Sequence, residues 1–201
     1  MKNRMIPALI LAVAMTAATV AGCSHNTTSG STAKSTNNSA STLPTVEDLT
    51  VVSAEITEEK EANDTNFTLN RVIDAGVQTP EGGHYFYLDI TVKNNTDEAY
   101  ELSTLNNFYL ALNDGSEITG AIQTQLYAVK NLSDKYNGSP FTVPANGEFS
   151  GIMGGFLVPS GKTPITVGFF PTKADINDKR NVFRVSIKAS DIIEIPDELK
   201  K

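Results

Sequence analysis

The residues that could perform chemistry in this chain are few, and they do not form a catalytic set. His84 is the only histidine in the part that we expect to fold, so it is the only conventional general base there. Gly161-Lys162-Thr163 has the last residue types of a phosphate-binding loop, but Phe156 stands where that loop needs its first glycine. Pro164 and the strand pattern after it argue against the helix that such a loop requires. The sequence predicts that the protein is not an enzyme and holds no cofactor.

Metal ligands are also scarce. One cysteine and two histidines are too few for an ordinary transition-metal site. Calcium needs only oxygen ligands, but neither acidic cluster follows the twelve-residue spacing of a calcium loop. These clusters are Glu58, Glu59, Glu61 and Asp64 in one segment, and Asp175, Asn177 and Asp178 in another. Solvated acidic loops are the simpler interpretation, and calcium binding stays an alternative.

Three tyrosines are the candidate binding residues. Tyr85 and Tyr87 alternate with apolar residues, so we expect them on the outer face of a strand, and we place Tyr109 on an outer face as well. Tyrosine is favoured at protein interfaces, whereas the sugar platforms of proteins usually contain the tryptophan that is missing here. Tyr85, Tyr87 and Tyr109 are therefore a candidate interaction surface.

Composition limits the classes of partner. The chain has 201 residues, a formal net charge of −7 and 40% hydrophobic residues, which suffice for one packed domain. An acidic chain has no electrostatic footprint for nucleic acid. The same charge disfavours binding to anionic lipid headgroups, so attachment to a membrane would need a lipid anchor.

The first residues have the order of a signal peptide. Lys2 and Arg4 precede an apolar run over 5–18 that is too short for a membrane span. Val20-Ala21-Gly22-Cys23 resembles the lipobox of bacterial lipoproteins. That resemblance implies cleavage before Cys23, thioether lipidation of its sulfur and acylation of its new amine. The protein is then anchored on the extracytoplasmic face of the cell membrane.

Composition also divides the chain. We assign 1–22 to the signal peptide, 23–43 to the lipidated cysteine and a tether, and 44–201 to the folded domain. Serine, threonine and asparagine dominate the tether, which cannot bury enough apolar surface to offset its chain entropy. A flexible chain of that length spans roughly 25 Å root-mean-square.

From residue 44 onward the pattern is that of β-strands. The clearest strand is 84–94, in which Phe86, Leu88, Ile90 and Val92 share the face opposite the tyrosines. Asp114-Gly115 between alternating segments predicts a hairpin after 108–112. Further alternating sets are Val52, Ala54 and Ile56; Phe67, Leu69 and Ile73; Ile152, Phe156 and Val158; Ile165, Val167 and Phe169; and Phe183, Val185 and Ile187.

These patterns predict an all-β, immunoglobulin-like antiparallel sandwich of about seven to nine strands. Clustered glycines near 151–155 indicate a bulge or a close backbone approach. The segment 120–140 is ambiguous, because Ile122, Leu126, Val129 and Leu132 fit helical spacing while its second half is polar and turn-rich. We expect an excursion between strands there, with a helical turn.

Several of these motifs together resemble a family. The strand over 85–93 ending in Asn94-Asn95, the segment Phe108-Tyr109-Leu110, and Pro144 to Glu148 leading into a glycine-containing strand are similar to an immunoglobulin-like domain of bacterial surface lipoproteins. Related folds include the mycobacterial immunoprotective extracellular antigen type. The resemblance covers roughly 48–190 and implies a two-sheet sandwich and a location, with no catalytic residue to transfer.

The sequence thus favours a lipid-anchored, non-catalytic binding module on the bacterial cell surface. Its partners would be the membrane, through Cys23, and a protein or envelope component. The alternative is a receptor-type lipoprotein that binds a small molecule or calcium. A patch of exposed apolar residues would favour the first hypothesis, and a concave site with converging polar groups would favour the second.

Overall fold

The structure is a computed structural model that describes residues 51–171 and 182–201. The signal peptide, the lipobox with Cys23, the tether and the second acidic cluster lie outside these ranges. All described residues belong to one compact unit, Thr42–Lys201. No helix within the described ranges has the length and apolar character that a membrane span requires.

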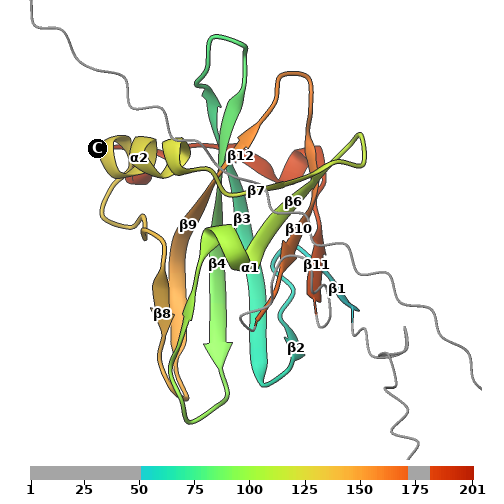
Figure 1. Cartoon of the computed structure of the whole chain (residues 1–201), viewed down its shortest axis with the longest axis vertical. Coiled ribbons are helices and arrows are strands. Elements are labelled where there is room, and N and C mark those ends of the chain that lie inside the picture. Colours follow the sequence, from blue (N-terminus) through green and yellow to red (C-terminus); the bar gives the residue numbers. More distant parts are fainter. Residues whose placement is uncertain (1–50, 172–181) are drawn as a thin grey trace, which may run out of the picture. The chain divides into compact units, whose positions relative to one another are not determined.

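The described residues form a β-sandwich (Figure 1). The first sheet is, in spatial order, β1 (Val51–Glu55), β11 (Val182–Ser186), β10 (Pro164–Phe169), β6 (Phe108–Leu112) and β7 (Glu117–Thr119). The second is β12 (Ile192–Glu194), β3 (Thr65–Val77), β4 (His84–Asn94) and β9 (Glu148–Val158), with β2 (Lys60–Ala62) also on β3. A third pair joins β5 (Tyr100–Leu102) to β8 (Phe141–Val143).

Within the described ranges, short helical segments lie between the strands or follow the last one. Two are α-helices, α1 (Thr104–Asn107) and α2 (Ile122–Asn131). Two are single 3-10 turns near the C-terminus, Ala189–Asp191 and Asp197–Leu199. The sandwich class, the strand at 84–94 and the hairpin after 108–112 are confirmed. The structure has more strands than predicted, and two of the pairs, β1 with β11 and β12 with β3, are parallel.

The core lies between the two main sheets. At its centre the Phe67 ring lies 4.6 Å from Phe169, centroid to centroid, and Phe169 lies 4.7 Å from Phe108. The predicted inner face of β4 lines this core with four buried side chains: Phe86, Leu88, Ile90 and Val92. Alternation therefore identified the inner face of the longest predicted strand correctly.

Bulges in two strands place residues on the face opposite to the one that the sequence pattern predicted. On β3 the pairing shifts between Leu69 and Arg71, so Val72 takes the inner position and Ile73 turns outward. On β9 a second shift opposite Phe86 and Tyr87 places Ile152 on the outer face, away from Phe156. A bulge reverses alternation, which explains why the shared parity predicted for these residues was wrong.

Candidate interaction surface

The outer face of the second sheet is covered, and this overturns the prediction of an exposed tyrosine surface there. Tyr87 is completely buried and Tyr85 is 8% exposed. Both belong to a second apolar cluster with Ala128, Leu132 and Leu199, which come from α2, the residue that follows it, and the C-terminal turn. An added layer thus hides the face that strand alternation alone would leave in water.

Tyr109 is also buried, with 2% of its surface exposed. It lies on the outer face of the first sheet against Phe170 and Val182. A Cβ atom at Gly168 would fall 1.8 Å from a ring carbon of Tyr109, so the missing side chain leaves the space that the ring occupies. The three tyrosines are therefore packing residues, and their predicted outward exposure was wrong.

The bulge in β9 provides the place where α2 rests. Gly154 and Gly155 adopt positive φ angles of 105° and 127°, which glycine accepts readily. A Cβ at Gly155 would lie 2.2 Å from the Thr124 hydroxyl oxygen, so any side chain there would push the helix away. The glycine cluster that indicated a bulge is also where β9 and α2 approach each other closely.

Tyrosine hydroxyls hold this layer in place. The Tyr87 hydroxyl donates a 2.7 Å hydrogen bond to the Thr124 carbonyl oxygen, and the Tyr136 hydroxyl donates one of 3.0 Å to the Gly154 carbonyl. The two rings meet edge to face with centroids 5.8 Å apart. Burial raises the pKa of Tyr136 to about 12, and burial together with neighbouring tyrosines raises that of Tyr87 further.

The opposite side of α2 carries an exposed apolar stripe. Ile122, Leu126 and Val129 are 66%, 67% and 61% exposed. They follow one another at four- and three-residue intervals, so they lie on one side of the helix. Leu105 of α1 is 39% exposed, and its side chain lies beside Gly120, just before α2. We call Ile122, Leu126 and Val129 the α2 stripe.

The helical spacing in 120–140 thus predicted helical structure correctly, but most of the apolar residues that show the spacing face outward. The sequence predicts a helical turn, and the structure has a helix of 10 residues. Of the four residues that showed the spacing, only Leu132 is buried. Thr124 and Ala128 face the sheet instead, because the glycine bulge allows only small side chains at the contact.

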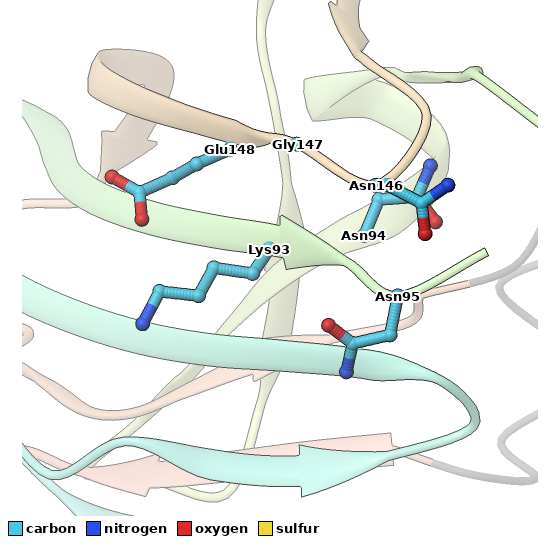
Figure 2. Close-up of a pocket in the computed structure, with 6 residues that line it drawn as sticks. All are labelled: Lys93, Asn94, Asn95, Asn146, Gly147 and Glu148. Carbon is cyan, nitrogen blue, oxygen red and sulfur yellow. The ribbon is translucent and has the colours of Figure 1, made fainter. Parts of the chain in front are cut away.

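A polar hollow of about 380 Å³ lies where β4 ends and β9 begins (Figure 2). Lys93, Asn94 and Asn95 face Asn146, Gly147 and Glu148 across it. The Lys93 ammonium forms a 2.6 Å ion pair with Glu59, and the Asn95 amide donates a 2.7 Å hydrogen bond to Asn66. These contacts bind the edges of the hollow to β3 and to the segment just before β2.

Asn94 itself is part of the fold and not a ligand group. Its amide nitrogen donates to the carbonyl oxygens of Glu98 (2.7 Å) and Pro144 (3.1 Å). Its amide oxygen accepts from the backbone nitrogen and the hydroxyl of Thr96, at 2.9 and 2.7 Å. The side-chain hydrogen-bonding capacity of Asn94 is used by the turn that follows β4 and by Pro144, so this residue of the Asn-Asn ending has a structural explanation.

A second hollow, of about 240 Å³, brings together two features that the sequence singled out. His84 and the turn Gly161-Lys162-Thr163 both line it. His84 Nδ1 lies 2.8 Å from a carboxylate oxygen of Asp74, and the Lys162 ammonium lies 2.8 Å from Asp114. Each of these two side chains already has a carboxylate partner, which limits its attraction for a further anion.

Two residues of the acidic segment in the described range are paired with lysines. Glu58 forms a 2.6 Å ion pair with Lys60, and Glu59 pairs with Lys93. Within residues 51–171 and 182–201 no group of three or more His, Cys, Asp or Glu side chains is arranged to hold a metal ion. The calcium alternative therefore receives no support from the geometry of this segment.

A comparison with protein families matches residues 54–179 to the domain of unknown function DUF4352. The chain belongs to this family. The match runs from β1 to beyond β10, so it includes the Asn94 turn and α2 of this DUF4352 domain. A comparison with curated proteins finds no match.

Three solved structures are similar to the DUF4352 protein in fold. A proposed lipoprotein of Bacillus subtilis, ycdA, is 15% identical with a TM-score of 0.43, over 66% of this chain and 39% of its own. The secreted protein MPT63 of Mycobacterium tuberculosis is 12% identical with a TM-score of 0.44, and the match covers 69% of this chain and 98% of MPT63. An uncharacterised β-sandwich protein of Clostridium difficile is 15% identical with a TM-score of 0.42, and the match covers 73% of this chain and 100% of that protein. At these values the similarities carry no argument about function.

Proposed function

We propose that this DUF4352 protein is a lipid-anchored, extracytoplasmic binding module without catalytic activity, held at the bacterial cell surface through Cys23. The lipobox at 20–23 supports the anchor. The α2 stripe supports binding through a surface, because three adjacent aliphatic side chains exposed on one helix are costly in water unless something covers them. That stripe is the observation that carries the proposal.

The polar hollows fit this function better than they fit catalysis. In the larger one the Asn94 amide already has four hydrogen bonds within the fold, and in the smaller one His84 and Lys162 are paired with carboxylates. Neither places a nucleophile and a base within hydrogen-bonding distance of each other in the described contacts, as nucleophilic catalysis requires.

The anchor is tested in a bacterial host by metabolic labelling with a clickable fatty acid and by mass spectrometry of the N-terminal peptide. We expect label on the full-length wild-type protein and none on Cys23→Ala. Ser24→Ala, which alters the neighbouring residue, should be labelled like the wild type. An unlabelled wild-type protein that is cleaved elsewhere and released into the medium would contradict the anchor.

The surface is tested by placing a photo-crosslinking amino acid at Leu126 in intact cells. We expect an adduct from this position and none from Ile165, an exposed aliphatic residue on β10 that is 44% accessible. Equal crosslinking at the two positions would show that α2 is not a contact surface.

A small-molecule receptor is the second candidate, because His84 and the Lys162 turn converge on one hollow. Thermal melting of the unlipidated Cys23→Ser mature chain against envelope glycans, metabolites and calcium tests it. A ligand at 100 times its Kd should stabilise the fold by about 2.7 kcal/mol. A rise in melting temperature that Lys162→Ala removes would make the receptor the leading function. No rise with any of these compounds would rule out the receptor hypothesis.

A further inference from the structure

We infer that the α2 stripe rests on the bilayer to which the chain is anchored, so that α2 is the membrane-facing side of the domain. The inference rests on the proposed function: it keeps the lipid anchor at Cys23 and names the bilayer as what the α2 stripe contacts. Ile122, Leu126 and Val129 would sit among the headgroups and upper acyl chains, with the axis of α2 along the membrane surface.

The length of chain before the first described strand makes the bilayer the nearest apolar phase. Residues 24–50 join Cys23 to Val51. A chain of that length behaving as a coil spans about 30 Å root-mean-square, and fully extended it reaches about 90 Å. An anchored domain therefore meets the bilayer at a high effective concentration, without a new translational cost for each contact.

The size of the stripe argues against a second copy of the chain. A stable protein interface buries about 800 Å² on each partner and involves about 20 to 30 residues a side. Three aliphatic side chains with Leu105 beside them offer much less than that. A bilayer needs neither shape complementarity nor a large patch, because the anchor already supplies most of the binding.

The charge of α2 itself suits an anionic surface. The chain has 23 acidic and 16 basic residues, so most orientations would bring carboxylates toward an anionic surface. The ten residues of α2 include Lys130 in the last turn and no acidic residue. Lys201 lies beside it, with its backbone nitrogen donating to the Asn131 carbonyl and its ammonium to that of Val129. Long lysine side chains can extend to headgroups from the edge of an apolar stripe.

The test uses the single cysteine of the chain. When the Cys23 sulfur is held in its lipid thioether, a cysteine introduced elsewhere is the only free thiol, so a polarity-sensitive fluorophore can be placed at one position. The lipidated mature protein is reconstituted into vesicles of phosphatidylethanolamine and phosphatidylglycerol, with or without a lipid that carries a quencher in its acyl chain. The labelled variants are Ile122→Cys, Leu126→Cys and Val129→Cys, with Ile165→Cys as the exposed control.

We expect a blue shift and lipid-dependent quenching at 122, 126 and 129, and neither at 165. Leu126→Glu should abolish both signals from a fluorophore at 122 while the protein stays on the vesicles. Because Leu126 is exposed, this substitution leaves the core unchanged.

Vesicle flotation separates the two levels of the argument. If the wild-type protein does not float with the vesicles, the anchor itself fails. If it floats but the fluorophore at 126 remains in water like that at 165, the anchor stands and the membrane-facing orientation is wrong. A blue shift without lipid quenching would show that another copy of the chain, or residues before Val51, cover the stripe, and would also overturn the inference.

Discussion

The hydroxyl of Tyr87 donates a 2.7 Å hydrogen bond to the carbonyl oxygen of Thr124, across 37 residues of sequence. This bond joins the second sheet to the helix that carries the exposed stripe. Because Thr124 also lies against Gly155, the position of α2 is defined by a close approach to β9 and by a buried hydrogen bond from β4. The orientation of the α2 stripe, the proposed interaction surface, therefore depends on a residue that is itself fully buried.

Removing that hydroxyl should loosen the helix. We expect Tyr87→Phe to lower the free energy of unfolding by about 1–2 kcal/mol, because a buried hydrogen bond is lost while the ring is kept. Tyr85→Phe is the matched control, since Tyr85 packs edge-on against Tyr127 and makes no hydrogen bond through its hydroxyl among the described contacts. Urea unfolding measures both, and equal losses in the two variants would contradict the role of the Thr124 contact.

The same tyrosines predict a loss of stability at alkaline pH. Burial raises the pKa of Tyr136 to about 12, and the pKa of Tyr87 is raised as well. Groups with a raised folded-state pKa contribute their full stability below the unfolded-state value, near 10, and lose it as the pH rises above that value. Near pH 11 we expect a loss of about 1 kcal/mol for each tyrosine.

Urea unfolding between pH 8 and 11 measures this loss, and absorbance at alkaline pH reports phenolate formation. The double variant Tyr87→Phe, Tyr136→Phe should show a smaller fall over the same range. If the wild type and the double variant fall in parallel, the lysine ion pairs and not the tyrosines account for the pH dependence.

In the turn after β4, we expect replacement of Asn94 to lower the stability of the fold much more than replacement of Asn95. Asn94→Ala removes four hydrogen bonds from a residue that is 1% exposed, and we expect a loss of about 3 kcal/mol. Asn95→Ala removes one exposed contact to Asn66 and should cost less than about 1 kcal/mol. Chemical denaturation of the two variants compares them directly, and similar costs would show that Asn94 does not organise the turn.

Tyr109 and Gly168 form a pair that a double-mutant cycle can test. A methyl group at Gly168 would overlap the tyrosine ring, so Gly168→Ala should destabilise the fold by about 3 kcal/mol. In a Tyr109→Ala background the same change should cost less than about 1 kcal/mol, because the ring is gone. Additive effects in the cycle would contradict the proposed overlap.

The sequence predicted the sandwich and the inner face of its longest strand because alternation reports local burial. It could not show that the outer face beside Tyr87 is covered, since that depends on residues near 124, 132 and 199 folding back over the sheet. A strand pattern carries no information about a third layer.

The exposure of the α2 stripe was missed for a related reason. The apolar spacing of Ile122, Leu126 and Val129 was visible, but apolar residues at helical spacing usually face a core. The clue to the opposite orientation was the glycine pair at 154–155, which accepts only a closely packed helix face with small side chains such as Thr124 and Ala128. Residues far apart in sequence had to be combined to identify the exposed face.

The parallel pairing of β1 with β11 also affects the time that folding takes. Val51 through Glu55 align with Val182 through Ser186, so this edge of the first sheet closes only after nearly the whole described chain is available. Contacts that join such distant segments slow folding, because the loop between them must be ordered before they form. We expect folding in milliseconds to seconds rather than microseconds. A chain emerging from an export channel would therefore keep an unpaired strand edge until residues 182–186 follow.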